Sequence, residues 1–201
     1  MPRRKEEGKR KKILDAATRI FARKGFHGAN ISDIAHEAGV AHGTVYTYFG
    51  SKDDLLASIF HENLSELVGY VRSEVQNEKN AEAKFRRMIA LQIKLIEQNP
   101  ELTELMLVEF PRTGKFLDHS TINTLSAYID MIADVLKEGM AEGTFDDTMD
   151  IDVVATMIYS AIQGIATRWI LYMRQYPLIE KVTDEVSNVF LKGIKVESER
   201  G

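Results

Sequence analysis

The side chains best suited to direct chemistry in this 201-residue chain lie in a short segment, residues 42–48, which reads His-Gly-Thr-Val-Tyr-Thr-Tyr. Thr and His can hydrogen-bond to the edges of DNA bases, and a Thr methyl or a Tyr ring can contact the methyl group of thymine. The segment has no arginine for bidentate contact with guanine, so sequence preference would rest on these groups and on DNA shape. On a helix, the outward-facing set would be His42, Gly43, Thr44, Thr47 and Tyr48.

Residues around this segment suit contacts with phosphate, which fix the register of a protein on a duplex. Tyr46 offers a hydroxyl and Lys52 an ammonium group. Asn30 and Ser32 stand at the expected start of the preceding helix, where backbone amides also favour anions. The candidate DNA-binding residues are therefore Asn30, Ser32, His42, Gly43, Thr44, Tyr46, Thr47, Tyr48 and Lys52.

Two short helices and a tight turn must position these side chains. Asn30, followed three residues later by Asp33, is typical of a helix start. Ala35 allows two helices to cross closely, and Gly39 can adopt the positive φ that ends the first helix. Residues 30–49 therefore predict a helix-turn-helix whose second helix enters the major groove. Similar turns also occur in purely structural hairpins, so the spacing alone leaves both interpretations open.

The wider segment from Gly25 to Leu56 resembles the DNA-binding domain of TetR-family regulators. That family typically carries the pattern I-A-x-x-A-G-V-x-x-G-x-x-Y-x-Y-F-x-x-K, and residues 34–52 read IAHEAGVAHGTVYTYFGSK. The departures are Ala41, where Ser or Thr usually caps the recognition helix, and Ala29, where Thr is common. The resemblance implies a homodimer that binds a near-palindromic operator, usually as a repressor, and that a small effector releases. It also implies DNA contact by the nine candidate residues.

Charge is unevenly distributed along the chain, which has a net charge of −4. Residues 1–60 contain 11 Lys and Arg against 7 Asp and Glu, whereas the remainder contains 15 against 23. Such asymmetry points to one end that meets phosphate and one that does not. Arg3, Arg4 and Lys5 are candidates for an arm in the minor groove, and a solubilising tail is the alternative.

In every segment with a regular hydrophobic pattern, apolar residues recur at the spacing of a helix. No segment shows a comparably clear alternation of apolar and polar residues, which would indicate a strand. Beyond the helix-turn-helix we expect helices at about 51–78, 81–98, 100–110, 121–143, 150–176 and 180–195. The prediction is an all-α fold of about nine helices. It comprises a three-helix DNA-binding domain at residues 1–52 and a helical ligand-sensing and dimerisation domain at residues 53–201.

The last two expected helices carry more apolar surface than a monomer core needs. Burial in a four-helix bundle between two subunits would account for this surface, and completion of the chain's own core is the alternative. The candidate dimer-interface residues are Ile158, Ile162, Ile165, Val182, Val186, Val189 and Phe190.

An effector pocket is harder to place, because Met and aromatic stripes also make ordinary cores. Gln163 and Arg168 stand out, since polar groups in an apolar helix need partners. Arg168 could meet an anionic head group or an acid such as Glu109. The candidate pocket residues are Met106, Phe110, Tyr128, Met131, Ala161, Arg168 and Trp169.

Within the family, three stretches look like fatty-acid-degradation regulators that respond to long-chain acyl-CoA. They are the run from Val40 to Phe60, EGMAEGTF at residues 138–145 and GIATRW at residues 164–169. A xenobiotic sensor that controls an efflux pump is the main alternative. We therefore expect an apolar or amphipathic effector and a DNA operator as partners.

Other functional classes find little support in the sequence. The chain has no cysteine, and its five histidines lack the spacing of metal ligands, so we expect neither an enzyme nor a cofactor or metal. The apolar stretch at residues 153–173 contains Gln163 and Arg168, which favours a buried helix over a membrane span. No apolar stretch follows the basic N-terminus, so we expect no secretory signal and a cytoplasmic location.

Overall fold

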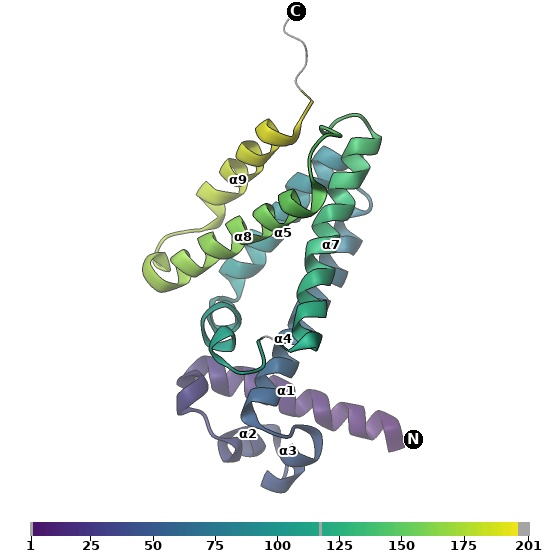
Figure 1. Ribbon diagram of the computed structural model, residues 1–201. Coiled ribbons are helices and arrows are strands. Elements are labelled where there is room, and N and C mark those ends of the chain that lie inside the picture. The colour runs from purple at the N-terminus through teal and green to yellow at the C-terminus, as the bar shows by residue number, and fades with distance from the viewer. Residues whose placement is uncertain (1, 117, 197–201) are drawn as a thin grey trace, which may run out of the picture. The chain divides into compact units, whose positions relative to one another are not determined.

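The computed structural model describes residues 2–116 and 118–196, with side chains described from residue 6 onward except at 179–181. These residues form nine α-helices, and the predicted all-α fold is confirmed (Figure 1). The helices divide into two compact units. The first unit comprises the described residues up to Asn63 together with Glu101–Ile122, and the second unit comprises Leu64–Pro100 and the described residues from Asn123 onward.

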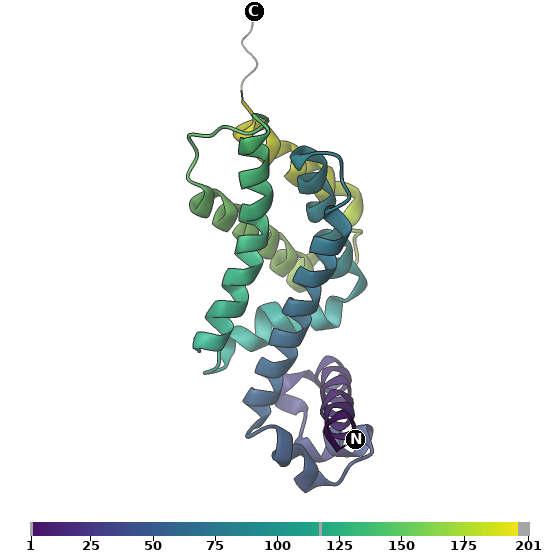
Figure 2. The same ribbon diagram turned by 90° about the vertical axis from the view of Figure 1, so that its right-hand side faces the viewer.

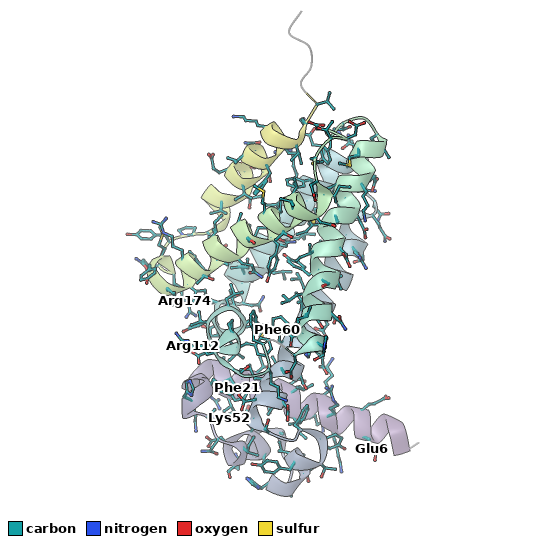
Figure 3. All side chains as sticks on the ribbon, viewed as in Figure 1. Glu6, Phe21, Lys52, Phe60, Arg112 and Arg174 are labelled. Carbon is teal, nitrogen blue, oxygen red and sulfur yellow. The ribbon has the colours of Figure 1, made fainter. Side chains whose placement is uncertain are left out.

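The first unit contains α1 (Pro2–Gly28), α2 (Ile31–Ala38), α3 (His42–Tyr48) and the first half of α4 (Lys52–Val75). α1 packs against α2, and α2 packs against α3. The N-terminal end of α1, where Glu6 is labelled in Figure 3, extends away from α2 and α3. Buried apolar side chains that hold these helices together include Ile13, Phe21, Ile34, Val45, Leu55 and Leu56.

A bend interrupts α1 near its C-terminal end. Gly25 has φ 70° and ψ 162°, outside the helical region, and the chain then completes one more turn up to Gly28. Gly25 therefore interrupts the helix, and the chain changes direction there. Because only glycine adopts this φ at little cost, the change of direction depends on that residue.

The middle of the chain returns to the first unit. α6 (Pro100–Glu104) continues into a π-helical segment η1 (Leu105–Glu109) and a 3₁₀ turn η2 (Phe110–Arg112). The sequence predicted one regular helix over residues 100–110. Pro111 explains the difference, because a proline lacks an amide hydrogen and collides with the carbonyl four residues earlier.

The second unit contains the second half of α4, α5 (Ala81–Gln98), most of α7 (His119–Ala141), α8 (Ile151–Arg168) and α9 (Ile179–Ile194). α8 continues into a π-helical segment η3 (Trp169–Met173). Figure 2 shows the green α7 running alongside the blue α4. Side-chain contacts join the helices of this unit: Arg72–Asp134 (3.2 Å) links α4 to α7, Arg87–Glu74 (2.5 Å) links α5 to α4, and Arg86–Asn188 (3.0 Å) links α5 to α9.

None of the described helices has the length and apolar character needed to span a bilayer. Among the described side chains, no group of three or more His, Asp or Glu residues is arranged to hold a metal ion.

Candidate DNA-binding surface and effector region

The helix-turn-helix is built by local interactions at both ends of α2. The side-chain oxygen of Asn30 accepts a hydrogen bond from the backbone amide of Asp33 (2.8 Å), which caps the N-terminus of α2. At the other end, Gly39 adopts the left-handed conformation (φ 66°, ψ 37°) and its amide donates to carbonyls of the last turn. Ile34 and Val45 are buried between the helices. These contacts fix α3 relative to α2.

α3 exposes most of its predicted DNA-contacting side chains. His42, Gly43, Tyr46 and Thr47 are exposed, whereas Thr44 and Tyr48 are half-buried. The rings of His42 and Tyr46 meet edge to face with centroids 5.4 Å apart, and the Thr47 hydroxyl donates to the carbonyl of Gly43 (3.3 Å). The helix therefore presents donors, acceptors and an aromatic edge on one side, as direct contact with base edges requires.

The start of α3 has no side-chain cap. Ala41 stands at the N-cap position, and no side chain hydrogen-bonds to the first amides of the helix. This agrees with the departure from the usual Ser or Thr noted in the sequence. Asn30 and Ser32, the two candidates for phosphate contact on the other helix, are both exposed.

Lys52 has a structural role that the sequence did not reveal. Its ammonium group donates to the backbone carbonyls of Phe26 (2.8 Å) and Ala29 (3.0 Å) and lies 4.6 Å from the centre of the Phe26 ring. It thus joins the start of α4 to carbonyls at and just after the bent end of α1 (Figure 3). A phosphate contact by Lys52 stays a prediction, since a third hydrogen of the ammonium remains.

Ion pairs hold α1 against α2. Arg19 and Arg23 contact Glu37 at 2.9 and 3.3 Å, and Lys24 contacts Asp33 at 2.8 Å. The hydrogen bond from Arg19 lowers the pKa of Glu37 below its usual range. These three basic side chains are therefore engaged within the unit. The side chains of Arg3, Arg4 and Lys5, the candidate minor-groove arm, lie outside the described residues.

The returning segment of the first unit contacts both α1 and α4. Phe110 stacks on Phe60 of α4 with ring centroids 4.4 Å apart. Lys115 forms an ion pair with Asp54 at 3.0 Å, and Asp54 also accepts a hydrogen bond from Ser51. The hydrogen bond from Lys115 lowers the pKa of Asp54. Residues 101–122 are thus attached to the start of α4, which follows directly on the recognition helix.

The predicted pocket residues fall into both units. Met106 and Phe110 belong to the first unit, where Phe110 is buried in the aromatic stack. Glu109, the acid suggested as a partner for Arg168, instead lies 3.3 Å from Arg112 and 3.9 Å from His27 in that unit. The other five predicted pocket residues, Tyr128, Met131, Ala161, Arg168 and Trp169, belong to the second unit. The pocket as a whole stays a prediction.

Within the second unit, aromatic side chains join α7 to α8. Tyr128 is buried and meets Tyr159 with ring centroids 5.4 Å apart, and burial raises the pKa of both phenols. Tyr159 shares a side-chain hydrogen bond with Gln163, which gives that polar residue its partner. Arg168 is exposed, so it does not need the buried partner that the sequence suggested. The Trp169 indole donates to the carbonyl of Tyr176 (2.8 Å).

Residues 13–59 match the sequence profile described as "Bacterial regulatory proteins, tetR family", and residues 60–193 match "YsiA-like protein, C-terminal region". The chain belongs to the tetR family. The predicted family and the predicted class, a DNA-binding transcriptional regulator, are therefore confirmed.

Individual relatives of this tetR-family chain include regulators of lipid metabolism. The fatty acid metabolism regulator protein of Bacillus subtilis is 27% identical over 90% of this chain and 93% of its own length. The solved structure of the fatty acid degradation regulator FadR from Bacillus halodurans is 29% identical, with a TM-score of 0.84 over 92% of this chain and 95% of that one. FadR from B. subtilis in complex with stearoyl-CoA is 27% identical, with a TM-score of 0.83 over 91% and 98%.

The seven predicted dimer-interface residues of the tetR-family chain differ in burial. Ile158, Ile162 and Val186 are buried, Ile165, Val182 and Phe190 are half-buried, and Val189 is exposed. The first three are part of this chain's own core, which was the alternative left open by the sequence. The spacing of apolar residues identifies the apolar face of a helix. It does not tell which of these residues pack in the chain's own core and which contact another subunit.

Besides Val189, two apolar side chains of α8 that were not predicted for the interface are exposed. Val153 and Met157, one turn apart on α8, are 54% and 56% exposed, and Val189 on α9 is 58% exposed. We call Val153, Met157 and Val189 the exposed apolar set. Apolar side chains exposed to this degree on neighbouring helices are candidates for contact with another protein surface.

Proposed function

We propose that this chain is a ligand-responsive transcriptional repressor that binds a near-palindromic operator as a homodimer. The observation that carries the proposal is the exposed face of α3, with His42, Tyr46 and Thr47, on a capped helix-turn-helix of a tetR-family chain. Residues 1–52 read the DNA, and residues 53–201 sense the effector and form the dimer. The protein acts in the cytoplasm, where bacterial DNA lies, and carries out no catalysis.

The proposed effector is a long-chain acyl-CoA. This assignment is supported by the likeness to FadR from B. subtilis, whose structure contains stearoyl-CoA, and to other fatty-acid regulators over more than 90% of the chain. The buried apolar side chains of α5 and α7, such as Met88, Leu91 and Met131, give the second unit an interior that suits an acyl chain.

The returning segment is the proposed route from effector to DNA. Residues 101–122 follow α5 directly in sequence and continue into α7, while their own contacts are with α1 and α4. Displacement of α5 or α7 by an effector would therefore pull on the start of α4 through Lys115 and Phe110. Because α3 lies four residues before α4, a small change there alters the orientation of the recognition helix.

The DNA-binding part is tested by fluorescence anisotropy with a labelled fragment of the gene's own upstream region. Binding should weaken steeply as salt is raised. Tyr46→Phe should reduce affinity for all sequences, because it removes a phosphate contact, whereas Thr47→Val should change sequence preference. Unchanged binding in both variants would refute the assignment of α3 as the recognition helix.

The effector part is tested by adding ligands to the protein–operator complex. Stearoyl-CoA at micromolar concentration should dissociate the complex, and free CoA at the same concentration should not. Release by apolar dyes but not by stearoyl-CoA would indicate the alternative, a xenobiotic sensor. Absence of release by either would leave the DNA-binding proposal standing and refute the proposed effector.

A further inference from the structure

The side chain of Gln92 is buried without any hydrogen bond. Gln92 lies in the second half of α5 and is 2% exposed, and neither the nitrogen nor the oxygen of its carboxamide has a partner. On α9, the hydroxyls of Thr183 and Ser187 are also buried without partners, and Ser187 is 1% exposed. Unpaired polar groups in an interior cost free energy and call for an explanation.

The register of α5 and α9 places these groups near the same level of the second unit. The two helices pack against each other, and they run antiparallel, because residue numbers rise along α5 as those of their partners on α9 fall. Three contacts define the register: Glu82–Lys195 (2.6 Å), Arg86–Asn188 (3.0 Å) and Glu97 to the amide of Leu178 (2.5 Å). Interpolation between them places Gln92 level with Thr183, with Ser187 one turn further along α9. We call Gln92, Thr183 and Ser187 the polar seam.

The polar seam differs from the other buried polar atoms that lack hydrogen bonds. Among the described residues, those atoms are carboxylate oxygens of Asp33 and Glu109. Each has a basic group nearby: Lys24 lies 2.8 Å from Asp33, and His27 lies 3.9 Å from Glu109. The seam groups are neutral. Lys94, the basic residue of α5 nearest to Gln92 in the sequence, is exposed, and Arg86 is engaged with Asn188. The seam therefore lacks the charge that an anion would need.

The composition of the polar seam defines the ligand chemistry it can accept. A carboxamide supplies two N–H donors and a carbonyl acceptor, and each hydroxyl can donate or accept. Phosphate or carboxylate would be buried without a cation, which is unfavourable, whereas a neutral carbonyl needs only donors. The seam is flanked by buried apolar side chains, including Met88, Ile89 and Leu91 on α5 and Val186 and Leu191 on α9.

We propose that the polar seam binds the neutral thioester or amide carbonyl of an otherwise apolar effector. This inference rests on the proposed function, since it identifies the part of an acyl-thioester effector that the second unit recognises. The carboxamide of Gln92 donates to that carbonyl, and the hydroxyls of Thr183 and Ser187 complete its surroundings. These groups have no hydrogen-bond partner within the chain, so binding of the carbonyl gains hydrogen bonds that folding alone does not provide.

The first test measures thermal unfolding of the full chain without ligand. Gln92→Leu should raise Tm by about 3 °C, because it removes an unpaired buried amide. Gln163→Leu is the matched control: its side chain is hydrogen-bonded to Tyr159, so its replacement should lower Tm. A lower Tm for Gln92→Leu would show that the carboxamide is already satisfied, by water or by neighbours, and would overturn the proposal.

The second test uses two neutral probes that differ by one carbonyl, N-acetyl-S-decanoyl-cysteamine and its thioether analogue N-acetyl-S-decyl-cysteamine. Calorimetry on the wild-type chain should show about 10-fold tighter binding of the thioester, and Gln92→Leu should remove that difference. If the amide is the group recognised, both probes should bind equally to wild type and both should weaken about 10-fold in the variant. Equal affinities of wild type and variant, or no binding of either probe to wild type, would overturn the proposal.

Operator binding measured on the same preparations separates this inference from the proposed function. If wild type binds the operator but the probes fail, only the polar seam is refuted. If wild type binds no operator, the repressor proposal fails, whatever the probes do.

Discussion

The two units of this chain differ in the surroundings of their buried polar groups. In the first unit, the buried carboxylate oxygens that lack hydrogen bonds have a basic side chain nearby, and Lys52 makes two hydrogen bonds to backbone carbonyls. In the second unit, the carboxamide of Gln92 and two hydroxyls of α9 are buried without partners. The first unit therefore places a basic group near each of these carboxylates, whereas the second leaves neutral polar groups that a ligand can pair.

The two units also differ in the apolar side chains that they expose. Among its described residues, the first unit exposes two large apolar side chains, Tyr46 on α3 and Ile122 on α7. The second exposes Val153, Met157 and Val189 on α8 and α9. Apolar side chains on neighbouring helices suggest that the second unit is completed by another protein surface, and the proposed homodimer supplies a second copy of the same face.

The largest expected effect comes from placing charge on the exposed apolar set. The double variant Val153→Glu/Met157→Glu should convert a dimer to a monomer in sedimentation experiments, because burial of four unpaired carboxylates at a two-fold interface is unfavourable. Operator affinity should fall about 100-fold or more, since the two reading heads are no longer linked. Ile122→Glu, a change at an exposed apolar residue of the first unit, is the control and should stay dimeric. A dimer that survives the double change would place the interface elsewhere.

The next largest effect is expected at Lys52, and it separates two roles of that residue. Lys52→Met should reduce the free energy of unfolding by about 2 kcal/mol, because it removes two charge-assisted hydrogen bonds to carbonyls. Chemical denaturation measures this loss, and Lys12→Met on the exposed face of α1 should show none. If Lys52 instead acts mainly in DNA binding, the stability of the variant would be unchanged. The slope of operator affinity against salt concentration would then fall by the equivalent of about one phosphate contact.

Sequence patterns predicted the features that depend on neighbouring residues. Asn30 caps α2 and Gly39 has a positive φ, both as expected, and Ser51 hydrogen-bonds to Asp54 at the start of α4, where a helix was expected to begin. Each of these signals acts within about four residues of the chain, so residue type and spacing are sufficient to identify it.

Features that depend on distant residues were not predictable in this way. The partners of Lys52 are 26 and 23 residues earlier in the chain, and the return of residues 101–122 to the first unit has no local signal. The burial of Ile158 and Ile162 and the exposure of Val153 and Met157 also depend on which helices pack together. All four residues are apolar and helical, so hydrophobic period alone does not separate core from interface.

Smaller effects on stability are expected at two glycines, Gly39 and Gly43. Gly39 shapes the turn between α2 and α3, whereas Gly43 lies on the surface of α3 proposed to contact DNA. A Cβ atom would meet nothing within 4 Å at either Gly39 or Gly43. Gly39→Ala should cost about 1 kcal/mol, since an alanine is strained at φ 66°. Gly43→Ala lies inside α3 and should stabilise the helix by about 0.5 kcal/mol.

Operator binding distinguishes the two glycine variants further. Gly39→Ala should bind the operator normally once folded, whereas Gly43→Ala should bind about 10-fold more weakly because its methyl group stands between α3 and the duplex. Both values come from denaturation and anisotropy measurements on the same samples. Normal operator binding by Gly43→Ala would show that the start of α3 does not approach the bases.

The smallest expected effect on stability is at the ion pair between Lys115 and Asp54, and it tests how the units communicate. Both side chains are more than a third exposed, so Lys115→Met should lower Tm by at most about 2 °C. The hydrogen bonds from Lys115 first and Ser51 second hold the pKa of Asp54 below its usual range, so the variant should move this pKa upward in a carboxyl NMR titration. A carboxyl group with a lowered pKa stabilises the folded state above its unfolded pKa and loses that contribution as pH falls. The difference in Tm between wild type and variant should therefore vanish when the pH falls below the pKa of Asp54 in the folded protein.

The informative measurement on Lys115→Met is its response to effector. If residues 101–122 carry the signal through this ion pair, the variant should bind the operator with nearly wild-type affinity but need more stearoyl-CoA for release. Arg112→Met, which removes a contact to Glu109 inside the same segment, is the matched control and should respond as wild type does. Equal release curves for all three proteins would mean that Phe110 and its stack on Phe60, rather than the Lys115 ion pair, connect effector binding to the recognition helix.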